Sequence, residues 1–222
     1  MRLLVMIVLI FSCLTVQAWT PKTRGYMAMK AFAGYPADLK QALKGHRDTY
    51  LQHAMDPDMP DSSGALVNEG CILLERINKE LSGQPRFRVV AADLGRLMAV
   101  MAEMGDPFLG ENSATALDYR AYVERKLPRF FFAYQPLSFE EIRGIDPCVH
   151  LFSIRKMGDG FRKPIEDDYQ RFGNSVRFDD RSAAFGCGAL VFSDTCLEMC
   201  RTTILIWDSA CGEARNSKIL TD

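Results

Sequence analysis

Apolar residues recur every three or four positions along most of the chain, which is the spacing of amphipathic helices. Beyond residue 18, no run alternates apolar and polar residues over the length of a strand. Glycine and proline interrupt the pattern, and Ser62 or Ser63 can cap the third helix. Helices are predicted over residues 23–33, 37–54, 63–81, 87–104 and 115–127. The sequence therefore predicts an all-α fold.

The second half of the chain gives a less regular pattern. Residues 129–180 contain Phe130-Phe131-Phe132 and several prolines and glycines, so loops around short helices are expected there, with a turn at Asp159-Gly160. Residues 181–214 turn helical again, with a break expected near Gly186 and Gly188. Since no repeat or linker divides the chain, we expect a single domain over residues 19–222.

Residues 1–18 have the features of a cleaved signal peptide. Arg2 is followed by an apolar run to Phe11, and Val16-Gln17-Ala18 is a small-residue cleavage signature. The run is shorter than the ~20 residues that span a bilayer, so no retained transmembrane segment is expected. Cleavage after Ala18 predicts a secreted or periplasmic protein.

Charge gives no sign of a nucleic-acid partner. The chain has 27 basic and 28 acidic residues, and loss of Arg2 with the leader leaves a net charge of −2. Two local groups of cations are interpreted as solvated helix faces: Arg86, Arg88 and Arg96, and Arg120, Arg125, Lys126 and Arg129.

Six cysteines remain after the leader: Cys71, Cys148, Cys187, Cys196, Cys200 and Cys211. An even number in an exported chain favours disulfides, although the sequence does not choose among the possible pairings. A thiolate metal site formed by the last four is the less favoured alternative, since the paired Cys-x-x-Cys spacing of structural zinc sites is absent.

Four motifs occur in a characteristic order along the chain. They are Ala18-Trp19-Thr20-Pro21-Lys22-Thr23, His53-Ala54-Met55-Asp56-Pro57-Asp58, the stretch from Leu94-Gly95 to Pro107-Phe108-Leu109, and the Trp207 segment over residues 204–212. Together they resemble the zinc-dependent phospholipase C superfamily, which also contains the zinc-dependent single-strand-specific nucleases. The resemblance implies a multi-helix bundle in which several zinc ions activate water for attack on a phosphodiester.

The resemblance also assigns metal-site positions. In that family the mature N-terminal tryptophan binds zinc through its free amine and carbonyl, which here would be Trp19. The Pro-Asp loop supplies an aspartate, here Asp58, and the helix after Leu-Gly supplies a carboxylate, here Glu103. Asp58 and Glu103 are therefore the candidate catalytic residues, and His53 is a further candidate ligand.

Most of the family's histidine positions hold other residues. Ala99 and Leu109 stand at two of them, and Arg24 replaces the histidine of the first helix. Residues 64–70 offer Asn68 and Glu69 but no histidine, and the closing His-x-x-x-Glu region offers Asp118 and Glu124 at another spacing. The sequence therefore predicts a degenerate metal site, in which any zinc would depend on Trp19, His53, Asp58 and Glu103.

Two roles are open for Glu103. It is either a residual ligand or general base, or the partner of Arg24, whose fixed charge would replace that of zinc. We favour the ion pair, because an unpaired buried carboxylate costs several kcal/mol.

Three functions follow from these observations. The favoured one is an exported phospholipase C-like protein with a binding, non-catalytic role toward a phospholipid headgroup, a nucleotide or another protein. The alternative is a metal-dependent phosphoric-ester hydrolase that draws ligands from a reduced set: Trp19, His53, Asp56 or Asp58, Glu103, Asp118 and Glu124. The third is a disulfide-braced helical protein of unrelated role.

Overall fold

Helices form all of the regular secondary structure in the part of the chain that the structure describes. The computed structural model describes residues 18–132 and 146–219, without the side chains of residues 211–219. Its α-helices are α2 (Pro21–Ala33), α3 (Ala37–Leu43), α4 (Arg47–Ala54), α5 (Ser63–Leu81), α6 (Phe87–Met104), α7 (Ala114–Lys126), α9 (Pro147–Phe172) and α10 (Ala183–Ile219). Short 3-10 turns lie at Lys44–His46, Leu127–Arg129 and Ser175–Arg177. The all-α prediction is confirmed.

Hydroxyl side chains fix where several of these helices begin. The side chains of Thr20, Ser62 and Ser113 accept hydrogen bonds from the first-turn amides of α2, α5 and α7. α5 and α6 have the predicted bounds, since a serine cap and the pairs Ser82-Gly83 and Gly105-Asp106 delimit them.

The helix predicted over residues 37–54 is divided into α3 and α4. A 3-10 turn at Lys44–His46 separates them, and Gly45 lies at its centre. Glycine is a poor residue for a helix interior because its backbone loses more entropy on folding.

The prediction of loops around short helices over residues 129–180 is wrong for residues 147–172, which form one long helix. Asp146 caps α9, which continues for 26 residues through Asp159, Gly160 and the internal Pro164. Three ion pairs at the i,i+4 spacing stabilise it, namely Arg155–Asp159, Arg162–Glu166 and Lys163–Asp167. Residues 133–145 lie outside the described residues.

The break predicted in the last helix is also absent. α10 runs through Gly186 and Gly188 without interruption. A Cβ at Gly188 would lie 3.1 Å from the Phe130 ring. This glycine therefore permits close packing where a helix break was expected.

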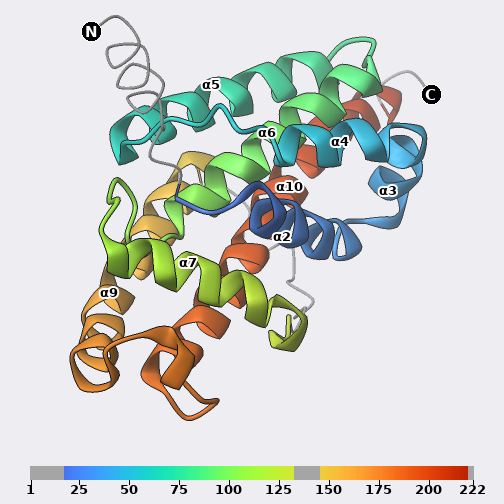
Figure 1. Ribbon diagram of the computed structural model, residues 1–222. Coiled ribbons are helices and arrows are strands. Elements are labelled where there is room, and N and C mark those ends of the chain that lie inside the picture. The colour runs from blue at the N-terminus through green and yellow to red at the C-terminus, as the bar shows by residue number, and fades with distance from the viewer. Residues whose placement is uncertain (1–17, 133–145, 220–222) are drawn as a thin grey trace, which may run out of the picture.

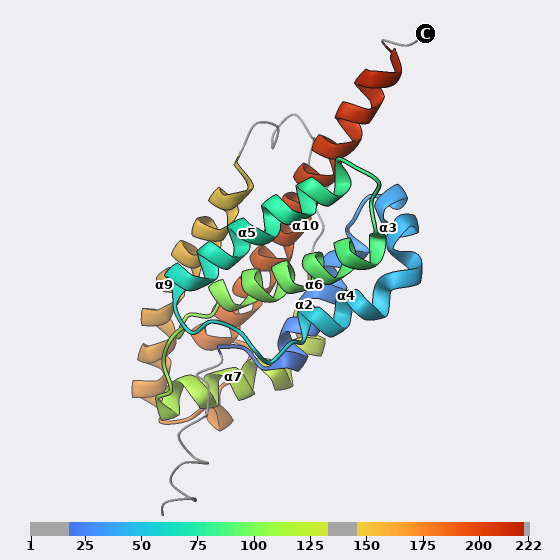
Figure 2. The same ribbon diagram turned by 90° about the horizontal axis from the view of Figure 1, so that it is seen from above.

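α6 lies at the centre of the helical assembly (Figures 1 and 2). It contacts α2, α3, α4, α5, α9 and α10. Its side chains from Leu97 to Met104 are all buried. One cluster of buried apolar side chains extends from Trp19 to Ile206 and joins these helices.

One disulfide, Cys71–Cys148, links α5 to α9. Cys187, Cys196 and Cys200 are buried free thiols, so the expectation that the cysteines pair generally is wrong for these three. The thiols of Cys196 and Cys200 instead contact the carbonyls of Met27 and Ala31 in α2. Cys211 lies outside the described side chains.

One stretch within the described helices, Ala183–Ala210, is long and apolar enough to cross a membrane. Half of its apolar window is buried inside the protein, and core helices of soluble proteins meet the same criterion.

Candidate functional site

The guanidinium of Arg24 joins three segments at the core of the protein. The Thr20 cap begins α2 and places Arg24 in the following turn, where its side chain is fully buried. Its Nη1 atom donates to the Glu103 carboxylate on α6 and, at 3.2 Å, to the carbonyl of Trp19. Its Nη2 atom donates to the carbonyl of Asp56 at 2.6 Å. We call these four residues the Arg24 centre.

Glu103 is buried within this centre, with a side-chain exposure of 1%. Its second carboxylate oxygen accepts a hydrogen bond from the amide of Ala18 at 2.9 Å. Burial raises the pKa of Glu103 to about 7, while Arg24 and the Ala18 amide act in the opposite direction. The ion pair that the sequence favoured is therefore present in the structure.

Gly95 sets the position of α6 against α4. A Cβ at this residue would lie 2.1 Å from the carbonyl oxygen of Tyr50. One turn further along α6, Ala99 is fully buried. This small-residue contact, expected from the sequence, lets α6 approach closely enough to present Glu103 to α2.

A second arginine, Arg96, extends the polar network from Asp56. Its Nη1 atom lies 3.3 Å from the Asp56 carboxylate, and its Nε atom donates to Glu69 at 2.5 Å. Asp56 thus contacts Arg24 through its carbonyl and Arg96 through its side chain. Glu69 falls in the range where the family resemblance places a histidine.

A third arginine pair was not predicted. Arg120 of α7 is only 3% exposed, and its Nε atom donates to the fully buried Asp106 at 2.7 Å. The same guanidinium donates to the carbonyls of Phe108 and Glu111, which fixes the loop after α6. Burial raises the pKa of Asp106, and Arg120 opposes this.

The interpretation of Arg120 as a solvated cation is wrong, because the loop after α6 covers it. One signal in the sequence could have found it. Arg120 stands four residues before Glu124, the spacing that the resemblance gives for histidine and glutamate. A search for any cation at that spacing would have selected it. Arg125 and Arg129 are exposed, as expected.

The other predicted ligands form no hydrogen bond with Arg24 or Glu103 among the described residues, although two of them adjoin Asp56. Asp58 is exposed in the loop before α5, and its amide donates to the Asp56 carboxylate at 3.0 Å. His53 is half-buried at the end of α4 and lines a surface hollow with Asp56. Leu109 is half-buried and packs against the core.

The two acids of α7 have separate partners. Asp118 accepts hydrogen bonds from the Tyr169 hydroxyl and from the amide and hydroxyl of Ser175. Burial raises the pKa of Asp118, but these hydrogen bonds outweigh it and hold the pKa below its usual range. Glu124 accepts from Thr20 and Lys22. Asp118 and Glu124 therefore stabilise the contacts of α7 with the chain around it.

The residues of the Arg24 centre do not fit a zinc ion. A guanidinium already lies against the carboxylate and both carbonyls that could face a metal, and Ala99 and Leu109 have no donor atoms. Among the described residues, no three side chains of His, Cys, Asp or Glu form a metal-binding group. Burial also raises the pKa of Cys187 to about 11 and that of Cys200 to about 12, which disfavours the thiolate form that binds zinc.

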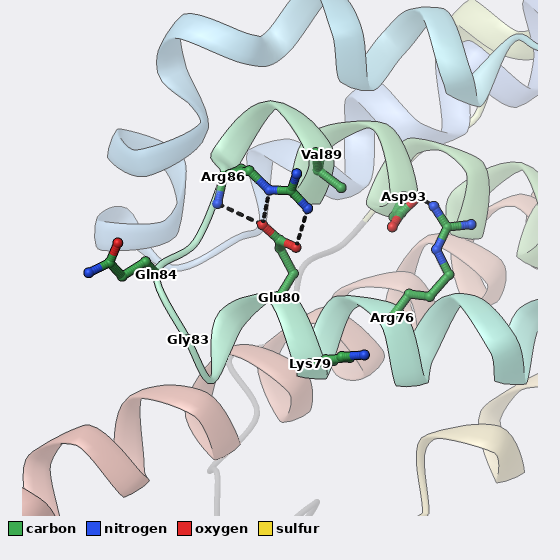
Figure 3. Close-up of a pocket in the computed structure, with 8 residues that line it drawn as sticks. All are labelled: Arg76, Lys79, Glu80, Gly83, Gln84, Arg86, Val89 and Asp93. Carbon is green, nitrogen blue, oxygen red and sulfur yellow. Dashed lines mark hydrogen bonds and ion pairs between the residues drawn. The ribbon is translucent and has the colours of Figure 1, made fainter.

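A surface hollow of about 400 Å³ lies where α5 ends and α6 begins (Figure 3). Arg86 forms a two-point ion pair with Glu80 there and lowers the pKa of Glu80 to about 2. Arg76 donates to Asp93 at 2.8 Å across the same hollow (Figure 3). Both arginines of the hollow are thus paired with acids, which leaves Lys79 as its one lining cation without an ion pair among the described residues.

Comparison with known proteins gives no family assignment. No protein-family model matches the chain, and no curated protein matches its sequence.

Proposed function

We propose that this chain is an exported protein of the zinc-dependent phospholipase C type whose metal centre has degenerated, and that it acts by binding instead of catalysis. One observation carries the proposal: the buried Arg24 guanidinium contacts Glu103, the Trp19 carbonyl and the Asp56 carbonyl together. These groups belong to the segments that the family resemblance assigns to the metal site.

A guanidinium can supply the charge of an ion without its chemistry. Arg24 donates N–H groups to a carboxylate and two carbonyls, so it satisfies oxygen atoms that would otherwise be buried without partners. It stays protonated in proteins and, unlike zinc, has no coordination position at which a water could be bound and activated. The centre thus favours a structural role for Glu103 over a role as metal ligand or general base.

Hydrolysis assays test the proposal against the phosphoric-ester hydrolase alternative. The purified chain would be incubated with a phosphodiester, with phosphatidylcholine vesicles and with single-stranded DNA, each with added zinc or with a chelator. We expect no turnover above the protein-free blank in any of these reactions. Chelator-sensitive turnover that Glu103→Gln abolishes would overturn the proposal and support the hydrolase.

A matched variant makes the assay specific to the proposed centre. Glu75→Gln changes an exposed acid of α5 that belongs neither to the Arg24 centre nor to the ligand set of the hydrolase alternative. A hydrolase that depended on Glu103 would keep its activity in Glu75→Gln. Both variants should be as inactive as the wild-type chain if the proposal holds.

A further inference from the structure

A third hollow, of about 520 Å³, lies at the end of α2 that is remote from Arg24. We call it the Phe131 pocket. It is lined by Lys30, Ala33, Gly34, Tyr35, Pro36, Lys40, Phe130, Phe131 and Phe132. Phenylalanines at such a hollow serve either as part of the core or as a wall for a ligand.

The inner wall of the Phe131 pocket is held by core contacts. The Tyr35 hydroxyl lies 3.0 Å from that of Tyr50 and 3.2 Å from the Met98 sulfur. The Phe130 ring is 5% exposed, and its centroid lies 5.8 Å from that of Phe192 on α10. These contacts fix the shape of the wall before any ligand arrives, as in most small-molecule sites.

The rim of the pocket is apolar and open to solvent. Phe131 is 79% exposed, the second most exposed of the large apolar side chains in the described residues. A solvent-exposed phenylalanine beside a preformed hollow gains free energy when an apolar group covers it. The phenylalanine run therefore serves both roles, since Phe130 belongs to the core and Phe131 faces solvent at the rim.

Lys30 and Lys40 give the pocket a positive charge. Its lining contains no acidic residue, and neither ammonium forms an ion pair within the described ranges. Lys40 donates to the Ala33 carbonyl at 3.2 Å, which uses one of its three donors, and Lys30 lies over the Tyr26 ring. Arg24, Arg96 and Arg120 are, by contrast, all paired with carboxylates.

The chemistry of the walls limits the charge of the ligand. The last carbonyls of α2 lie beside the pocket. Because the C-terminal end of a helix carries a partial negative charge, it disfavours a multiply charged anion. Two lysines line the pocket, and one of them, Lys40, already donates to the Ala33 carbonyl, so together they suit a single negative charge. The aromatic wall requires an apolar body on the same molecule.

We propose that the Phe131 pocket binds a small amphiphilic carboxylate, with its apolar body against Phe131 and Tyr35 and its acid group between Lys30 and Lys40. The site is independent of the Arg24 centre and does not depend on the function proposed above. Aromatic acids and fatty acids share this chemistry.

Titration calorimetry on the full chain, with 2-naphthoate and decanoate as separate ligands, tests the proposal. We expect saturable binding of at least one of them, and the one that binds more tightly identifies the aromatic or the fatty source. Lys30→Gln and Lys40→Gln should each weaken binding about tenfold, because each removes one charge-assisted hydrogen bond. Phe131→Ser should weaken it by a similar factor through lost apolar contact.

Lys44→Gln is the matched control, since Lys44 is exposed in the 3-10 turn after α3 and does not line the pocket. It should bind like the wild-type chain. Decyltrimethylammonium, which has the same apolar body and the opposite charge, should not bind. Failure of both carboxylates to bind, or equal binding by the Lys30→Gln, Lys40→Gln and Lys44→Gln variants, would overturn the proposal.

Discussion

Under the function proposed above, the Arg24 guanidinium takes the place that the family resemblance gives to a metal ion. It is buried against one carboxylate and two carbonyls, each from a different segment. The free energy of such a pair depends on both partners, because a buried charge without its counter-charge costs far more than the intact pair contributes. Removal of either partner therefore reports on the centre more clearly than any surface substitution.

Arg24→Met is predicted to lower the free energy of unfolding by about 3–5 kcal/mol near neutral pH. It leaves Glu103 buried without its cation and deprives the Trp19 and Asp56 carbonyls of their donor. Urea denaturation measures the loss. Arg129→Met is the control, since it breaks the pair of exposed residues Arg129 and Asp180 and should cost at most about 1 kcal/mol. Equal losses in the two variants would contradict a buried pair.

The loss of stability in Arg24→Met should depend on pH, because Glu103 titrates. The folded-state pKa of Glu103, about 7 in the wild type, exceeds its ordinary value of 4.5, so the unfolded chain releases this proton first. The contribution of Glu103 to the free energy of unfolding is therefore at its full value below pH 4.5 and decreases as the pH rises toward 7. Without Arg24 the pKa rises further, so the deficit of the variant should be larger at about pH 8 than at about pH 5. A deficit independent of pH would argue against this role of Glu103.

At the residue scale, the sequence predicted the ion pair of the Arg24 centre and missed the buried pair of Arg120 and Asp106. Arg24 and Glu103 were found because both stand at ligand positions of one motif set. Arg120 and Asp106 were missed because burial of Arg120 depends on the loop after α6 folding over α7, a contact that no local pattern encodes.

At the scale of elements, glycine acts oppositely in α6 and α9. Gly95 has no space for a side chain, since the Tyr50 carbonyl of α4 lies where its Cβ would be. Gly160, in the interior of α9, has no atom within 4 Å of a built Cβ. Substitution of glycine by alanine should therefore destabilise the contact of α6 with α4 at Gly95 and stabilise α9 at Gly160.

Gly95→Ala is predicted to destabilise the protein by about 1–3 kcal/mol or more through overpacking between α4 and α6. Gly160→Ala is its matched control and should raise the free energy of unfolding by about 0.5–1 kcal/mol, since alanine loses less backbone entropy in a helix. Chemical denaturation of both variants gives the comparison. Destabilisation by Gly160→Ala would instead support the turn that the sequence suggested.

α9 shows why that turn was expected. Gly158, Gly160 and Pro164 break the local helical pattern, and propensity alone disfavours a helix there. The i,i+4 ion pairs and the buried side chains of Leu151, Ile154 and Ile165 outweigh this preference. The local periodicity of a sequence does not reveal tertiary packing of this kind.

At the scale of the whole molecule, helix content and most bounds in the first half could be predicted from the sequence. Apolar spacing, the Ser62 cap and the helix-ending glycines Gly83 and Gly105 placed α5 and α6 correctly. The disulfide Cys71–Cys148 could not be chosen, because only the packing of α5 on α9 brings these cysteines together. The Phe131 pocket likewise depends on segments distant in the chain, the end of α2 and residues 130–132.

The zinc content of the purified chain, measured together with its thermal melting with and without chelator, tests the central claim most directly. A centre held by Arg24 and Glu103 needs no metal to fold, so we predict no zinc above the buffer blank and the same melting temperature in the presence of chelator. Stoichiometric zinc, with a melting temperature that the chelator lowers, would contradict the account.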